Sequence, residues 1–186
     1  MRRGFKTEAN GLSEEVRAEL GVGLLDPLDP RALAELLAIP IWKVTDFTDD
    51  HPGVAHLLDG GRELFSAVTV FLGTRRTIVH NDAHIEGRQH SNLAHELAHG
   101  LLAHPPTPAL DNRGCRDWNQ DIEDEASWLG GGLLVTEAAT LAIARGRWTK
   151  EEAAAHFKVS PQMIQFRLNA TGAAKRVQRE RQYRRR

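Results

Sequence analysis

The chain has 186 residues, of which 41% are hydrophobic and 26% are charged, and its formal net charge is −1 at pH 7. This length suffices for one domain with a buried core, and the near-zero charge excludes a global electrostatic attraction to nucleic acid or membrane. The single cysteine, Cys115, excludes an internal disulfide and a cysteine-rich structural zinc site.

No apolar run in the sequence approaches the roughly 18 residues that a membrane-spanning helix needs. The first residues are basic, but no apolar segment of the kind found in secretion signals follows them. We therefore expect a soluble, cytoplasmic protein with no membrane partner.

The first half of the chain predicts two helices and three strands. Residues 12–20 have apolar side chains at helical spacing, with Ser13 as a candidate cap. Asp29 followed by Pro30 marks a helix start, because the first is a preferred cap and the second fits the first helical position. Residues 46–61 are polar and predict a loop. Three apolar or β-branched runs predict short strands, the last two joined as a hairpin: 41–44, 67–72 and 77–80.

The second half of the chain predicts helices. One helix runs from about residue 88 to 103 and stops before two prolines. Asp117 can cap the next helix, in which the glycines at 130–132 cost about 2–3 kcal/mol relative to alanines and predict a kink or break. Helical character returns over residues 133–144. Three later boundaries are marked by capping residues: Thr149 with Glu152, Ser160 with Pro161, and Gly172.

Within the helix of residues 88–103, the five residues from His95 to His99 match His-Glu-x-x-His. Residues four apart on a helix differ by about 40° in direction, so the two imidazoles project from one face and can share one metal ion. Glu96 is near enough to reach a water on that ion without ligating it. Zinc lowers the pKa of such a water to about 7, and Glu96 can take its proton as it attacks a carbonyl.

The same pattern also fits two solvated histidines on a surface helix, and nine histidines in the chain raise the chance of a coincidental match. The residues around the motif are apolar, however: Leu93, Ala94, Leu97, Ala98, Leu101 and Leu102. A polar patch in such a helix is costly unless it has partners. The motif and its setting therefore predict a metal site.

A catalytic zinc site needs a third protein ligand. A third histidine six residues after His99 is excluded because that position is Pro105, and helical extrapolation puts His104 on the other side of the helix. The following helix carries four acids: Asp121, Glu123, Asp124 and Glu125. Each is also an ordinary residue for a solvated helix face, and composition alone does not choose the ligand among them.

Residues 78–104 (IVHNDAHIEGRQHSNLAHELAHGLLAH) resemble the ImmA/IrrE family of metallo-endopeptidases. Five features recur in the same order as in that family: Asn81, Arg88, Leu93, Ala94 and the motif at 95–99. The later stretch IEDEASWLGGGLLVT resembles the segment that carries the family's glutamate ligand. Aligned on Ala126, this resemblance implies Glu123 as the third metal ligand, with Glu125 as the alternative.

The chain departs from the family pattern at several positions near the motif. Ser127 stands where Asn or Asp is usual, one turn after the ligand, and such a residue orients a ligating histidine by a hydrogen bond. A serine can still accept that bond, but more weakly. Ser91 takes the place of a common Phe, and Gly130 that of a common Ala.

The resemblance implies a zincin-like α+β fold, mostly helical with one small β-sheet beside the active-site helix. It also implies a zinc-dependent endopeptidase that cleaves a specific protein, often a helix-turn-helix transcriptional repressor, by attack of zinc-bound water assisted by Glu96. Zinc is the expected cofactor, although manganese or iron would suit the same ligands. Arg88 and His104 are further candidates near the site, with a salt bridge or a solvated ring as their ordinary alternative.

We expect three segments: a metallopeptidase domain of residues 1–148, a helical pair of residues 149–172 packed on it, and a disordered basic tail of residues 173–186. The pair resembles a helix-turn-helix, with Lys158 at the usual turn glycine and Arg167 at an apolar position. From residue 175 onward, the sequence contains seven basic residues and one acidic residue. The alternative hypothesis is therefore a DNA-associated transcriptional regulator with a structural or vestigial metal site, whose tail makes weak nucleic-acid contacts.

Overall fold

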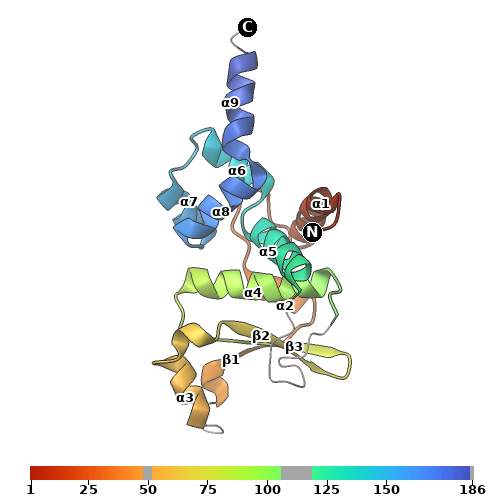
Figure 1. Cartoon of the computed structure of the whole chain (residues 1–186), viewed down its shortest axis with the longest axis vertical. Coiled ribbons are helices and arrows are strands. Elements are labelled where there is room, and N and C mark those ends of the chain that lie inside the picture. The colour runs from red at the N-terminus through yellow and green to blue at the C-terminus, as the bar shows by residue number, and fades with distance from the viewer. Residues whose placement is uncertain (48–51, 106–118, 185–186) are drawn as a thin grey trace.

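A computed structural model describes the chain except for residues 48–51, 106–118 and 185–186 (Figure 1). It has the expected α+β, zincin-like architecture: one small sheet lies against one side of a long helix, and most of the other helices, including all those of the C-terminal part, lie on its other side (Figure 1). Cys115 and Asp117 lie outside the described residues.

The sheet has three strands, β1 (Ile41–Lys43), β2 (Ala67–Leu72) and β3 (Arg75–His80), in the order β1-β3-β2. β1 runs parallel to β3, and β2 pairs antiparallel with it as the predicted hairpin. The hairpin turn needs a residue with positive φ, which Gly73 provides at 63°. β2 is thus at one edge of the sheet.

The two N-terminal helices are α1 (Phe5–Glu19) and α2 (Pro30–Leu36). Asp29 caps α2 by accepting a hydrogen bond from the Arg31 amide at 2.9 Å, as expected. α1 begins seven residues before the predicted start, because the buried Phe5 extends its apolar face. Ser13 is therefore not a cap. It lies in the interior of α1, and its buried hydroxyl donates a hydrogen bond to the Gly132 carbonyl at 3.0 Å.

The prediction of a loop over residues 46–61 is wrong in part. A 3-10 turn, η1 (Val44–Phe47), and a short helix, α3 (Pro52–Leu58), occupy much of it, followed by η2 (Arg62–Leu64). A short, largely exposed helix needs no apolar periodicity, so the sequence carries little signal for it. Pro52 suits the first position of such a helix.

Two long helices form the centre of the molecule, α4 (Glu86–Leu101) and α5 (Gln120–Leu134). Leucines on their facing sides are fully buried: Leu93, Leu97, Leu129 and Leu133. α5 is capped by the Asn119 side chain, and it runs through its three glycines without a break. The predicted kink is wrong because the glycines face neighbouring helices, where tertiary packing compensates for their weak helix propensity.

Gly130 marks the closest approach of the two central helices. A Cβ atom there would lie 3.0 Å from the carbonyl oxygen of Ala94 and 3.1 Å from the Cα of His95. These distances are shorter than a normal Cβ contact, so any side chain at this position would push the helices apart. The crossing point therefore lies directly at the first histidine of the motif.

The C-terminal helices are α6 (Glu137–Ala144), α7 (Lys150–Phe157), α8 (Pro161–Thr171) and α9 (Ala173–Tyr183). The predicted capping box of Thr149 with Glu152 is present, and Ser160 caps α8. Lys158, at the turn between α7 and α8, has the positive φ (53°) that a glycine there would adopt. This turn packs on α4, since a Cβ on Gly87 would lie 3.0 Å from the Val159 carbonyl carbon.

The expectation of a disordered tail is wrong for α9. Ala173 and Val177 are buried, and the exposed face is pinned by ion pairs from Arg176 to Glu137 and from Arg145 to Glu180. Beyond these contacts α9 extends away from the body (Figure 1). A run of basic residues indicates that a segment is exposed to solvent. It does not show whether a few apolar residues between them pack against the body.

Two fully buried arginines fasten the C-terminal end of α5. Arg17 of α1 donates to the Leu133 carbonyl at 2.6 Å, and Arg167 of α8 donates to the Val135 carbonyl at 2.9 Å. Burial lowers the pKa of Arg167 to about 10, so it remains charged at pH 7. A cation is favourable beside the free carbonyls of a helix end, which explains an arginine at a position expected to be apolar.

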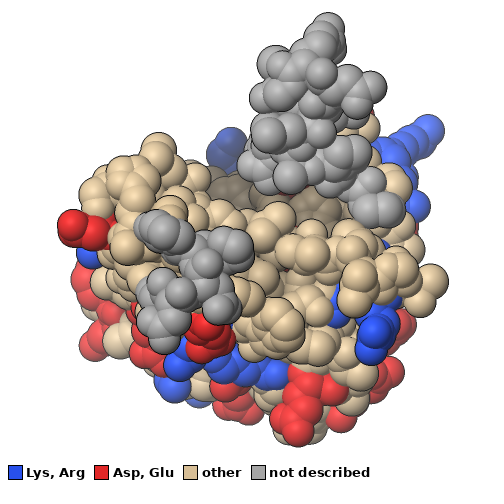
Figure 2. All heavy atoms as spheres, turned by 90° about the horizontal axis from the view of Figure 1, so that it is seen from below, with Lys and Arg blue, Asp and Glu red and all other residues tan. Residues whose placement is uncertain are grey.

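Viewed from the sheet side, the surface is largely uncharged in the middle, with basic and acidic residues around its rim (Figure 2). In the part of the chain that the structure describes, no single helix is long and apolar enough to cross a membrane. Helices α5 and α6 together pass that test of length and composition, but they are bent by 65° relative to each other.

Candidate metal centre

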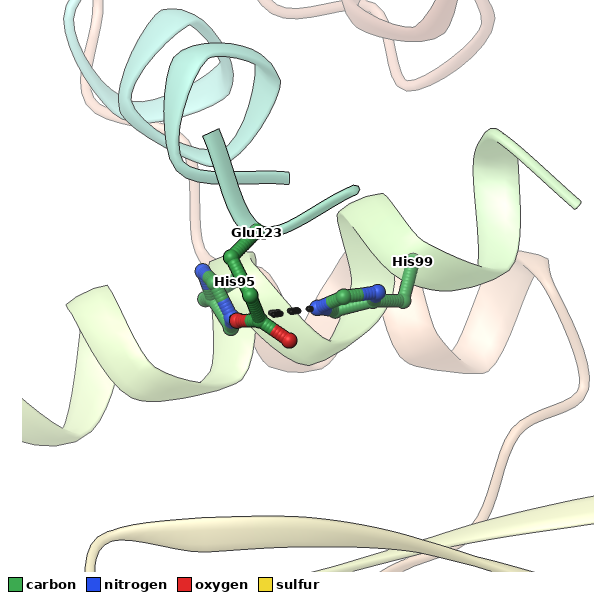
Figure 3. A group of neighbouring side chains, drawn as sticks. All are labelled: His95, His99 and Glu123. Carbon is green, nitrogen blue, oxygen red and sulfur yellow. Dashed lines mark hydrogen bonds and ion pairs between the residues drawn. The ribbon is translucent and has the colours of Figure 1, made fainter. Parts of the chain in front are cut away.

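Helix α4 places His95 and His99 one turn apart, and the Glu123 side chain points toward them from α5 (Figure 3). Nε2 of His95 lies 3.2 Å from Oε2 of Glu123 and 3.1 Å from Nε2 of His99. Nε2 of His99 lies 3.8 Å from the same carboxylate oxygen. One ligand atom from each residue lies within 4.8 Å of the others, which is close enough to hold one metal ion.

The chemistry of these three residues fits a catalytic metal site. Two imidazole nitrogens and one carboxylate oxygen are a ligand set of zinc enzymes, and they leave a coordination position open. Burial and the neighbouring His95 lower the pKa of His99 to about 4. His99 is therefore neutral at pH 7, and its Nε2 lone pair is available to a metal.

The other three acids of the 121–125 segment have different neighbours. Asp121 pairs with the N-terminal ammonium group, and Asp124 accepts a hydrogen bond from the Gln120 side chain at 2.7 Å. Glu125 lies 3.1 Å from the Arg2 amide and 3.7 Å from Nε2 of His104. Helical spacing separates Glu123 from Glu125 by about 200°, so the two face different sides of α5. Glu123 is the acid that joins the histidine pair.

Glu96 lies beside this group without belonging to it. The Thr69 hydroxyl of β2 donates to Oε2 of Glu96 at 2.6 Å. The two residues line a small cavity of about 90 Å³ together with His95, His99 and Glu123. The sequence gives no signal for Thr69, because only the packing of β2 on α4 brings it to the site.

His104 lies against His99, although extrapolation of the helix placed it on the far side. The helix ends at Leu101, and Ala103 adopts a positive φ of 51°. The amides of Ala103 and His104 then bond back to the carbonyls of Gly100 and His99, which is the Schellman ending of a helix. This turn returns the imidazole of His104 to 2.9 Å from Nδ1 of His99, Nδ1 to Nδ1.

The contact between the two imidazoles has a defined direction when Nε2 of His99 faces a metal. Nδ1 of His99 then carries the proton, and this N–H group donates a hydrogen bond to Nδ1 of His104. The proton of His104 is on Nε2, which points toward the Glu125 carboxylate 3.7 Å away. Burial lowers the pKa of His104, so its ring is neutral and can act as this acceptor. His104 thus holds the orientation of His99.

The remaining candidates from the sequence lie around this group. Arg88 forms an ion pair with Glu63 and a 3.3 Å hydrogen bond with Ser66, which is the ordinary alternative considered above. Ser127 is exposed and lines cavities shared with His95, but no hydrogen bond joins the two in the described part of the chain. The side chain of Asn81 donates to the carbonyls of Leu57 in α3 at 2.8 Å and of Phe65 at 3.2 Å, and so joins the segment before α4 to the segment before β2.

Residues 54–169 match a family model of M78 peptidases, described as an IrrE N-terminal-like domain. Comparisons with curated proteins and with solved structures give no match. The matched region contains all of α4 and α5, and therefore the whole group of His95, Glu96, His99 and Glu123.

The contact between His104 and His99 predicts that His104→Ala weakens zinc binding by about 10–100-fold, because Nδ1–H of His99 loses its acceptor and the ring its orientation. Competition with a fluorescent chelator at pH 7 measures this change. His56→Ala, at an exposed histidine of α3, is the matched control and should bind zinc like the wild type. Equal affinity of the His104→Ala and His56→Ala proteins would contradict the assigned role.

Proposed function

Because this chain belongs to the ImmA/IrrE family of M78 peptidases, we propose that it is a zinc-dependent endopeptidase that cleaves a specific protein. The observation that supports this most directly is the convergence of His95, His99 and Glu123 within 4.8 Å, with Glu96 at its side. We propose zinc as the metal because this ligand set suits it.

When bound, zinc would polarise the carbonyl of the scissile bond and make a water molecule acidic enough to react near pH 7. Glu96 accepts the proton of the attacking water and passes it to the leaving amine. The hydrogen bond from Thr69 fixes one oxygen of the Glu96 carboxylate in place for this transfer. The turn after α4 fixes the position of His104, and helix α5 fixes that of Glu123.

The site is open to a polypeptide. The side chains of His95, Glu123 and His99 are 28%, 21% and 17% exposed. Val68, Thr69 and Phe71 of β2 line the cavity at the metal ligands, and among the described residues the outer edge of β2 has no strand partner. An extended peptide can add to such an edge and present its carbonyl to the site.

We propose a transcriptional repressor of the helix-turn-helix type as the substrate, on the strength of the resemblance described above. Such a repressor encoded beside this gene is the first candidate to test. Zinc-dependent cleavage at one defined bond is the expected result.

Glu96→Gln should lower the rate of this cleavage by about 10²–10⁴-fold, because the amide cannot accept the proton of water. Zinc affinity should change little, since Glu96 is outside the ligand group. Electrophoresis with mass spectrometry of the products measures the rate. Glu86→Gln, at an exposed acid in the first turn of α4, is the control. Cleavage by Glu96→Gln at the rate of that control would refute the mechanism.

A second candidate function is supported by α9, which projects from the body with exposed basic side chains: Lys175, Arg179, Arg181 and Arg184. Together with the helix-turn-helix-like pair α7–α8, it favours a regulator that contacts nucleic acid phosphates. In this proposal the metal site is structural or vestigial.

If the second candidate is correct, the chain binds duplex DNA at 50 mM salt and loses most of that affinity at 200 mM, because each phosphate contact releases counterions. Replacing Arg179, Arg181 and Arg184 by Gln should abolish the mobility shift. The control replaces three exposed arginines elsewhere: Arg3, Arg62 and Arg75. No shift at low salt would eliminate this candidate.

A further inference from the structure

A second side of His95 faces a cavity that the proposed chemistry does not use. This cavity of about 250 Å³ lies between α4, α5 and α8. Its lining comes from all three helices: Ser91 and His95 of α4, Ser127, Gly130 and Gly131 of α5, and Met163 and Phe166 of α8. The helical pair α7–α8 therefore contributes directly to the surroundings of the metal ligands.

The cavity adjoins the space in front of the metal ligands, and the two share lining residues. A neighbouring cavity of about 270 Å³ is lined by Glu96 and Glu123, and it shares His95 and Ser127 with the first. Ser127 is exposed, so the boundary between the two cavities is a small side chain at the surface. A peptide whose carbonyl lies at the metal ligands can thus extend an adjacent side chain past Ser127 toward α8.

The lining is chemically suited to an apolar side chain. Among the described residues its lining contains no Asp, Glu, Lys or Arg, so a charged side chain placed there would lose water without gaining an ion pair. Met163 and Phe166 form its wall, and Phe166 remains 42% exposed beside the site. Methionine adapts its shape to different apolar partners, which suits a pocket for a flexible aliphatic chain.

Small residues keep this space open. A Cβ on Gly131 would lie 3.2 Å from the Phe166 ring and 3.6 Å from the Met163 sulfur. Ser91, Ser127 and Gly130, three of the positions at which this chain has smaller side chains than the pattern it resembles, also line the cavity. Its volume is below the roughly 300–1,000 Å³ of pockets for whole small ligands, but it is ample for one side chain.

We propose that this cavity is a specificity subsite, which takes one unbranched or γ-branched apolar side chain, of the methionine or leucine class, next to the scissile bond. The inference rests on the proposed function, because it assumes a peptide at the metal ligands. Phe166 and Met163 of α8 select this side chain, and Arg167 holds α8 in place by its hydrogen bond to Val135.

Two measurements test the subsite. In the first, the zinc-loaded enzyme digests a peptide library, and mass spectrometry gives the residues around each cleaved bond. The wild type should prefer Leu or Met over Gly at one position by roughly tenfold or more. Phe166→Ala should weaken this preference and admit larger aromatic side chains, whereas Ser91→Leu should fill the cavity and favour Gly or Ala. Tyr183→Ala, at an exposed aromatic residue of α9, is the control.

The second measurement needs neither metal nor cleavage. The chain has two methionines, Met1 and Met163, so labelling of the methionine methyl groups gives two NMR signals. N-acetyl-leucinamide should shift the Met163 signal, and N-acetyl-glycinamide should not. The Met1 signal should stay in place with both probes. Ser91→Leu should abolish the shift while the protein retains its cooperative unfolding transition.

The outcomes separate the two proposals. An unchanged cleavage profile in Phe166→Ala and Ser91→Leu, or a Met163 signal that does not respond to the leucine probe, overturns the subsite. If the Met163 signal shifts as expected but the wild type cleaves no peptide with zinc bound, the cavity has the proposed preference and the proposed function fails.

Discussion

The close crossing of α4 and α5 is the contact on which the rest of the site depends. At Gly130 the backbone of α5 lies so close to Ala94 and His95 of α4 that no Cβ atom fits between the two helices. Two turns earlier on α5, Glu123 then reaches the imidazoles of His95 and His99. Neither helix has the ligand set alone. A larger residue at the crossing would separate the carboxylate from the histidines.

Contacts at both ends of the central helices keep this crossing in place. Arg17 and Arg167 bind the last carbonyls of α5, so its register against α4 is set from α1 and from α8. At the other side, the Schellman turn after α4 returns His104 to His99. The strand β2 contributes Thr69, which orients Glu96. His99, Glu123 and Glu96 are thus each held by contacts at a different element, which favours a rigid and preorganised site.

The sequence predicted what depends on local spacing or on the family resemblance: the helix with His95, Glu96 and His99, the hairpin, the capped starts of α2, α7 and α8, and Glu123. It could not predict features that depend on tertiary contacts. The glycines of α5 looked like a break because propensity describes an isolated helix, whereas here they allow close packing. His104 was misplaced because a helix was extrapolated beyond its end, and Thr69 was missed because it is distant in sequence. In the basic C-terminal segment, Ala173 and Val177 are buried and hold α9 against the body.

We propose that α4 and α5 together hold one metal ion on His95, His99 and Glu123. Calorimetric titration of metal-free protein with zinc at pH 7 tests this for the wild type and for Glu123→Gln, with Asp121→Asn as the control on the same helix. We expect one zinc per wild-type chain and an affinity loss in Glu123→Gln greater than the roughly 10–100-fold of a residue that only orients a ligand. Absence of stoichiometric zinc binding, or equal affinity in Glu123→Gln and Asp121→Asn, would contradict it.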